Sequence, residues 1–143
     1  MIIRLLKKDD LIELENIEKS LFDNPFSKES CLEELITDNR LYLGLFDDNQ
    51  LIGYVGVMIT FDTADIIKVG VKKEYQGKGY SKRLMYLLLQ ILKDNGVKYV
   101  MLEVEHSNYK AINLYLSCGF KEISERKNYY GENSHAKIMR LEL

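Results

Sequence analysis

The sequence is poor in several residue types, and each shortage excludes a class of protein. It has no tryptophan, one proline (Pro25), two cysteines and two histidines among 143 residues. The two cysteines show neither CxxC nor other metal-like spacing, which excludes a disulfide scaffold and a cysteine-based metal site. No run approaches the roughly 18 consecutive apolar residues of a membrane span. No low-complexity tract indicates a disordered region or a collagen-like repeat.

What remains is the composition of one globular domain. Hydrophobic residues make up 46% of the chain and charged residues 29%, which are ordinary proportions. A chain of this length buries roughly 70% of the surface of its unfolded form, and we find no repeat or linker, so we expect a single domain over residues 1–143. The N-terminal segment soon becomes charged and lacks the apolar core and cleavage site of an export signal. We therefore expect a cytoplasmic protein with reduced cysteines.

The charge is nearly balanced overall but unevenly distributed. The formal net charge is -2; residues 1–40 carry ten acidic and six basic side chains, whereas residues 71–83 carry five basic side chains and one acidic one. An acidic protein with one concentrated basic segment indicates a small anionic ligand, not a long polyanion. We therefore expect neither nucleic acid nor a membrane as a partner.

The hydrophobic periodicity predicts an α+β domain. We expect strands over 1–6, 41–46, 51–61, 64–71, 97–104, 120–127 and 135–143. We expect helices over 8–20, 27–36, 82–96 and 109–118. Antiparallel strands come first and a β-α-β-α-β run follows, which predicts a mixed central β-sheet flanked by helices on both faces. The helix between the strands at 63–71 and 97–104 makes that pair a parallel crossover.

Three of these helices carry recognisable end signals. Ser27 is the expected N-cap of the second helix, with Ser30 as the alternative, and Asn108 is the expected N-cap of the fourth. Gly96 is a fitting residue just beyond the end of the third.

The segment from Val71 to Arg83 is the richest in chemical information. It reads as a strand end, a glycine-containing turn and the start of a long helix. The first amides of a helix have no intrahelical partner and carry partial positive charge, which suits phosphate oxygens. Gly77 and Gly79 would let a pyrophosphate approach the backbone closely. The segment matches neither the dinucleotide motif nor the P-loop, and a surface loop with solvated lysines explains the residues alone equally well.

This segment resembles the pyrophosphate loop of the GNAT family of acetyl-CoA-dependent N-acetyltransferases, whose pattern is Q/R-x-x-G-x-G/A. Here it reads Gln76-Gly77-Lys78-Gly79-Tyr80-Ser81, with serine in the last position. The resemblance implies the GNAT fold, acetyl-CoA as co-substrate and no metal. It also implies that the cofactor is bound by Val69, Gly70, Val71, Gln76, Gly77, Lys78, Gly79, Tyr80, Ser81, Lys82, Asn108 and Tyr115.

The second half of the chain extends the resemblance. The run LEVEHSNYKAINLYLSCGF followed by ERKNYY is similar to the RimI-type branch, which acetylates the N-terminal alanine of a small-subunit ribosomal protein. The implied partner is therefore the N-terminus of a ribosomal protein. The implied acceptor contacts are Phe26 and Ser27, where the family usually has Trp-Ser, and Tyr129 and Tyr130. An aromatic hairpin packed on the sheet is the alternative for the two tyrosines.

Acetyl transfer to an amine needs a base, an oxyanion site and a proton donor for the thiolate. Glu103 continues an apolar row near a strand end, where partial desolvation would raise its pKa towards that of the amine. A phenol stays protonated at neutral pH. On the residues alone, Glu103 as a solvated side chain and Tyr115 as a packing residue are the better interpretations; the resemblance assigns them as base and acid, with a backbone N–H near Val71 as the oxyanion site. We expect His106 and His135 at the surface.

The sequence thus leaves several functions open. The main hypothesis is acetyl transfer to a protein N-terminus by direct attack in a ternary complex. The alternatives are transfer to a small-molecule amine or a lysine side chain, a catalytically silent acyl-CoA-binding module, and a structural domain without affinity for coenzyme A. A group of acidic side chains could attract a basic acceptor or merely form a solvated helix face: Glu29, Glu33, Glu34 and Asp38.

Overall fold

The centre of the molecule is a seven-stranded mixed sheet. The computed structural model describes residues 1–143, and the strands lie in the order β1-β2-β3-β4-β5-β7-β6. They are β1 (Ile2–Leu5), β2 (Arg40–Asp47), β3 (Gln50–Thr60), β4 (Thr63–Val71), β5 (Tyr99–Glu105), β6 (Lys121–Gly131) and β7 (Ser134–Glu142). Only β4 and β5 pair in parallel; all other neighbours are antiparallel. The predicted mixed sheet and its parallel crossover are confirmed.

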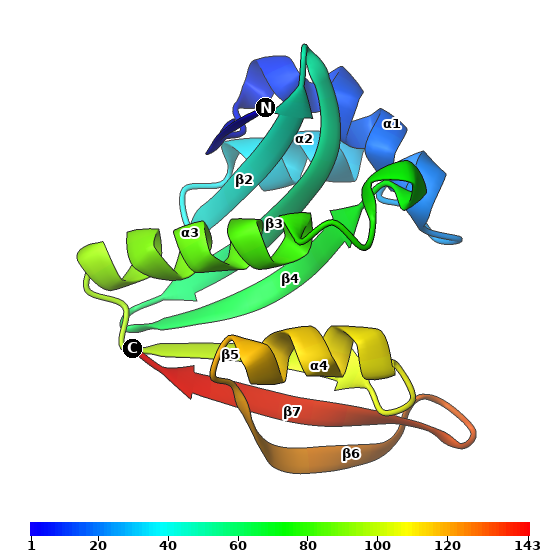
Figure 1. Cartoon of the computed structure of the whole chain (residues 1–143), viewed down its shortest axis with the longest axis vertical. Helices are drawn as coiled ribbons and strands as arrows, with labels where there is room; N and C mark the ends of the chain where they lie inside the picture. The colour runs from blue at the N-terminus through cyan, green and yellow to red at the C-terminus, as the bar shows by residue number, and fades with distance from the viewer.

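Four α-helices cover the sheet from both faces. They are α1 (Leu11–Leu21), α2 (Lys28–Ile36), α3 (Tyr80–Asp94) and α4 (Tyr109–Ser117), with short 3-10 helices η1 (Lys8–Asp10) and η2 (Lys73–Tyr75). Figure 1 shows α3 crossing β3 and β4, and α4 lying beside β5. None of the helices combines the length and the apolar composition needed to cross a membrane.

Strand alternation divides the interior into two cores. Leu43 of β2 and Val55 of β3 pack with α3 and α4, whereas Tyr42 and Tyr54 on the same strands pack with α1 and α2. Successive side chains of a strand point to opposite faces, so β2 and β3 can serve both cores at once.

Most expected element ends lie within two residues of those in the structure. The strand expected over 120–127 is too short, because β6 runs to Gly131, and two further differences have a clear local cause. The predicted helix 8–20 is wrong at its start: residues 8–10 form a 3-10 turn, and the Asp10 carboxylate is engaged by Arg4 at 2.8 Å. The strand expected from residue 97 begins at Tyr99, because the Val97 N–H donates to the Leu92 carbonyl at the end of α3.

The three predicted end signals, at Ser27, Asn108 and Gly96, are confirmed. The Ser27 hydroxyl accepts the Ser30 N–H at 3.1 Å, and Asn108 Oδ1 accepts the Ala111 N–H at 3.2 Å. Gly96, beyond α3, has φ +83°.

The feature that positions the functional site is the divergence of β4 from β5. The two strands pair only at Thr63, Ala64 and Asp65, and Figure 1 shows them separating beyond that point. The register of β4 against β3 also shifts between Gly56 and Val57. A bulge of this kind bends a strand. The edge of β4 that faces β5 is therefore left without a partner strand after Asp65.

The fully buried carboxylate of Glu18 links helix α1 to strands β3 and β4. Glu18 of α1 has 0% exposure and accepts hydrogen bonds from the Tyr54 hydroxyl, the Phe26 N–H (2.7 Å) and the Lys68 ammonium (2.7 Å). The same ammonium lies over the ring of Phe26, 3.8 Å from its centroid. This network joins α1, β3, β4 and the segment that leads into α2.

The substitution Glu18→Gln should destabilise the protein by about 3 kcal/mol, because it leaves Lys68 as an uncompensated charge in a largely buried place. Urea unfolding would measure the loss. The matched control is Glu15→Gln on the same helix, whose ion pair with Lys19 is long (3.8 Å) and exposed, so a change below about 1 kcal/mol is expected. Equal losses in the two variants would contradict this assignment.

Candidate functional site

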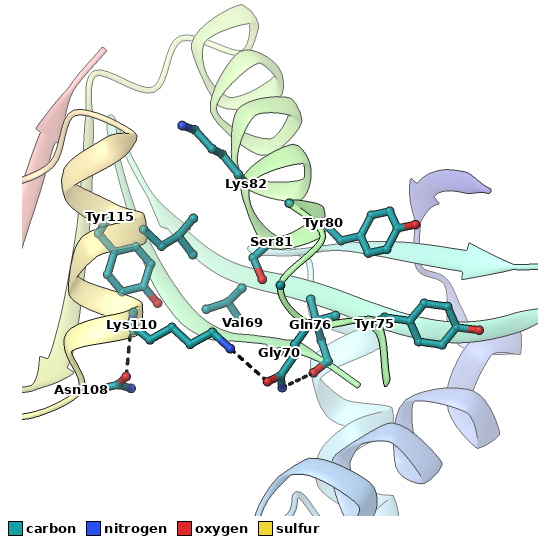
Figure 2. Close-up of a pocket in the computed structure, with 15 residues that line it drawn as sticks. Val69, Gly70, Tyr75, Gln76, Tyr80, Ser81, Lys82, Asn108, Lys110 and Tyr115 are labelled. Carbon is teal, nitrogen blue, oxygen red and sulfur yellow. Dashed lines mark hydrogen bonds between the residues drawn. The ribbon is translucent and has the colours of Figure 1, made fainter. Parts of the chain in front are cut away.

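A groove of about 350 Å³ lies between the end of β4, the start of α3 and the start of α4 (Figure 2). It is lined by every residue expected to bind the cofactor except Lys78. The Lys78 ammonium instead lies over the ring of Tyr75, 5.8 Å from its centroid. The groove therefore brings together segments that are far apart in the sequence.

The floor of this groove is a run of backbone amides without partners. None of the N–H groups of residues 77–82 donates a hydrogen bond within the chain; the first helical donor is Arg83, which reaches the Gly79 carbonyl at 3.1 Å. Gly77 and Gly79 have φ values of +76° and +82°, a conformation that is costly for residues with a Cβ. Free amides at a helix start carry partial positive charge, so this loop fits a pyrophosphate.

The Gln76 side chain fixes the position of the loop. Its Nε2 donates to the Val71 carbonyl at 2.8 Å, and its Oε1 accepts from Lys110 of α4 at 3.2 Å (Figure 2). Gln76 thus joins β4 to α4 across the groove, and it places the Lys110 ammonium at the groove. Lys110 was not identified from the sequence, because nothing there indicates that α4 reaches Gln76.

Tyr115 is the most deeply buried polar group of the groove. Only 5% of it is exposed, and burial raises the pKa of its phenol to about 12. The phenol therefore holds its proton throughout the neutral range. Tyr115 lines both this groove and the space between the diverging strands.

That space is a second cavity, of about 270 Å³, and it contains the two expected catalytic residues. Tyr115 enters it from α4 and Glu103 from β5, and Tyr130 closes it from β6. The cavity shares Val69, Asn108, Ala111 and Tyr115 with the cofactor groove. The two spaces therefore adjoin each other across these four residues.

Glu103 lies at the far side of this cavity with 34% of its side chain exposed. Its carboxylate is 3.6 Å from Nη1 of Arg126. Arg126 was not identified from the sequence, since only the pairing of β6 with β7, and of β7 with β5, places it near Glu103.

The four expected acceptor residues fall into two groups. Tyr129 and Tyr130 are each 49% exposed and line a third cavity, of about 450 Å³, which adjoins Glu103. Phe26 and Ser27 line none of the three cavities. Ser27 caps α2, and Phe26 is held by Glu18 and Lys68, the latter a lining residue of the second cavity.

The two histidines lie at the surface and are each partly covered. They meet near the turn of the β6–β7 hairpin, with ring centroids 4.8 Å apart, and the His135 N–H donates to His106 Nδ1 at 3.0 Å. No three side chains of the metal-binding types come together anywhere in the chain. The two cysteines, Cys31 and Cys118, are free thiols.

Comparison with known proteins identifies the family of this site. The model of the acetyltransferase (GNAT) family matches residues 9–120. A Bacillus subtilis protein is 33% identical over 138 residues, covering 96% of this chain and 91% of that protein. A Haemophilus influenzae protein, named ribosomal protein bS18-alanine N-acetyltransferase, is 35% identical over 133 residues, covering 93% of this chain and 90% of its own length.

Solved structures agree with this result. The crystal structure of the ribosomal-protein-S18-alanine N-acetyltransferase from Escherichia coli superposes with a TM-score of 0.91 at 29% sequence identity, covering 99% of this chain and 92% of that one. The expected fold is thereby confirmed. With its unpaired amide loop and its diverging strands, the chain belongs to the GNAT family of acetyltransferases.

Proposed function

We propose that this protein transfers the acetyl group of acetyl-CoA to the α-amine of an N-terminal alanine of a ribosomal protein. The observation that carries the proposal is that Glu103 and Tyr115 line one cavity, and that this cavity adjoins the groove with the unpaired amides. The substrate follows the names of the relatives, two of which, from Haemophilus influenzae and Escherichia coli, are named as S18-alanine N-acetyltransferases.

The groove holds the co-substrate through three elements. The amides of residues 77–82 bind the pyrophosphate oxygens. Lys82 and Lys110, which line the same groove, add positive charge. The unpaired edge of β4 at Val69–Val71 offers backbone groups to the amides of the pantetheine arm, as a strand would to its neighbour. The bound thioester is thereby directed towards the second cavity.

Glu103 and Tyr115 then divide the proton transfers between them. Glu103 accepts the proton of the acceptor ammonium, directly or through a water. An N-terminal amine has a pKa of about 8, so a carboxylate is a sufficient base. The neutral amine attacks the thioester carbonyl in the ternary complex, and as the C–S bond breaks Tyr115, which is protonated at neutral pH, donates its proton to the departing thiolate. The nitrogen of the new amide loses its second proton to solvent, and solvent returns a proton to the phenol.

The loop assignment predicts a selective loss of cofactor affinity in Gly79→Ala. Gly79 and Gly96 flank the two ends of α3 with nearly the same φ, and neither would bring a Cβ within 4 Å of other atoms. Both alanine variants should therefore lose a similar roughly 1–2 kcal/mol of stability. Calorimetry should show coenzyme A affinity reduced about tenfold or more in Gly79→Ala only. Equal coenzyme A affinities in the two variants would show that the loop does not bind the cofactor.

The proposed roles of Tyr115 and Glu103 predict that kcat depends on pH differently in variants of these two residues. Tyr115→Phe should reduce kcat by about 100-fold at every pH up to about 10, because no other group replaces the phenol proton. Glu103→Gln should show a similar loss at neutral pH but recover above about pH 8, where the α-amine is already deprotonated. The kcat of both variants can be measured at each pH by quenching the reaction at fixed times and quantifying the acetylated peptide by mass spectrometry. A Glu103→Gln variant with wild-type kcat at neutral pH would exclude this base.

The acceptor class predicts where the acetyl group appears. Incubation with acetyl-CoA and an alanine-starting ribosomal peptide should add one acetyl group to the α-amine, as located by fragmentation in a mass spectrometer. The same peptide with a blocked α-amine and a free lysine is the control and should gain nothing. Acetylation of the lysine instead would favour the side-chain acceptor, and binding without any transfer would favour a silent acyl-CoA-binding module.

A further inference from the structure

The third cavity offers a place for the acceptor residues that follow the reacting amine. It adjoins the second cavity, with which it shares five lining residues: Glu103, Tyr130, Ile66, Ile67 and Leu102. Its aromatic part is formed by Tyr129 and Tyr130, whose ring centroids lie 5.0 Å apart in edge contact. Its far end holds a carboxylate that the chemistry described above does not use, that of Asp65.

Asp65 is unusual because nothing in the chain neutralises it. It is half-buried at the last position where β4 pairs with β5, and it takes part in no side-chain hydrogen bond and no ion pair. Burial and the negative charge of Glu103 both raise the pKa of its carboxyl group. An unpaired carboxylate facing a second one is an unfavourable arrangement, and a cation in the groove would relieve it.

The cations on neighbouring strands are engaged elsewhere. Arg126 of β6 pairs with Glu103 and lies over the ring of Tyr129, 5.4 Å from its centroid. Arg140 of β7 lies over the ring of Tyr99 of β5, 4.8 Å from its centroid. The Lys68 ammonium, on β4 itself, is held by the buried Glu18 on the α1 side. None of these three cations pairs with Asp65, so its carboxylate is available to a cation from another molecule.

We propose that Asp65 is a specificity-determining residue that pairs with a lysine or arginine at the second or third position of the acceptor. This inference rests on the proposed N-terminal acetylation. Asp65 pairs with Met101, which is two residues before Glu103 on β5. The distance from Asp65 to the level of Glu103 is therefore about 7 Å along the strand. An extended peptide with its amine at Glu103 covers that distance in two residues. Tyr129 and Tyr130 would pack against the aliphatic stem of the basic side chain.

The test uses the full chain with coenzyme A or acetyl-CoA and a matched set of peptides. All begin with alanine; they carry arginine, norleucine or glutamate at position two or at position three. Wild-type protein should bind and acetylate the best arginine peptide about tenfold better than its norleucine counterpart, mainly through KM. Asp65→Asn should abolish that preference, so that this variant acetylates the arginine peptide and its norleucine counterpart with equal kcat/KM.

The matched control is Asp62→Asn. Asp62 is exposed in the turn just before β4 and lines none of the three cavities, so the preference for arginine should survive in this variant. Thermal unfolding of both variants checks that they are folded.

The possible outcomes distinguish a failure of this inference from a failure of the proposed function. An unchanged arginine preference in Asp65→Asn overturns the inference. An equal loss for all peptides also overturns it, since Asp65 would then act on the α-amine that they share. If no peptide is acetylated by wild-type protein, the proposed function fails; calorimetric affinities in the presence of coenzyme A still decide whether Asp65 selects basic peptides.

Discussion

The loss of pairing between β4 and β5 after Asp65 is the constraint on which the rest of the site depends. A continuous ladder would fill the space between these strands and satisfy their backbone groups internally. Because the ladder stops after three pairs, a cavity opens between the strands, and the edge of β4 keeps hydrogen-bonding groups for a ligand. The bulge in the β3–β4 pairing bends β4 at the same place. The opening is therefore built into the sheet and needs no separate lid or insertion.

Two helices bring complementary chemistry to this opening. The start of α3 supplies free amides, and α4 supplies Tyr115 from its side facing the cavity. The α4 start is fixed by its own cap, Asn108, and by the contact of Lys110 with Gln76. The unpaired amides and the buried phenol are thus held on opposite sides of one groove. This arrangement is what acetyl transfer from a phosphate-bearing thioester requires, because one end of the co-substrate must be fixed while the other reacts.

Three carboxylates in and around the β4–β5 region have different surroundings. Glu18 is fully buried and saturated by an ammonium, a hydroxyl and an amide, so it stabilises the fold and holds the Phe26 segment. Glu103 is partly exposed, lies 3.6 Å from one arginine and lines the same cavity as Tyr115. Asp65 has no partner at all, which makes it suited to an external cation. Residue type alone does not distinguish these three; the partners supplied by other elements do.

The sequence by itself determined the order of helices and strands, the caps at Ser27 and Asn108, and the glycine-containing anion loop. These features depend on neighbours within a few positions, through side-chain periodicity and local hydrogen bonds. Only the tertiary structure decided four other features. These are the start of α1, the contact between His106 and His135, the hydrogen bond from Lys110 to Gln76, and the placement of Asp65 and Arg126 near Glu103. Each depends on side-chain interactions or on residues distant in the chain, and local patterns carry no information about which strands become neighbours or where two of them separate.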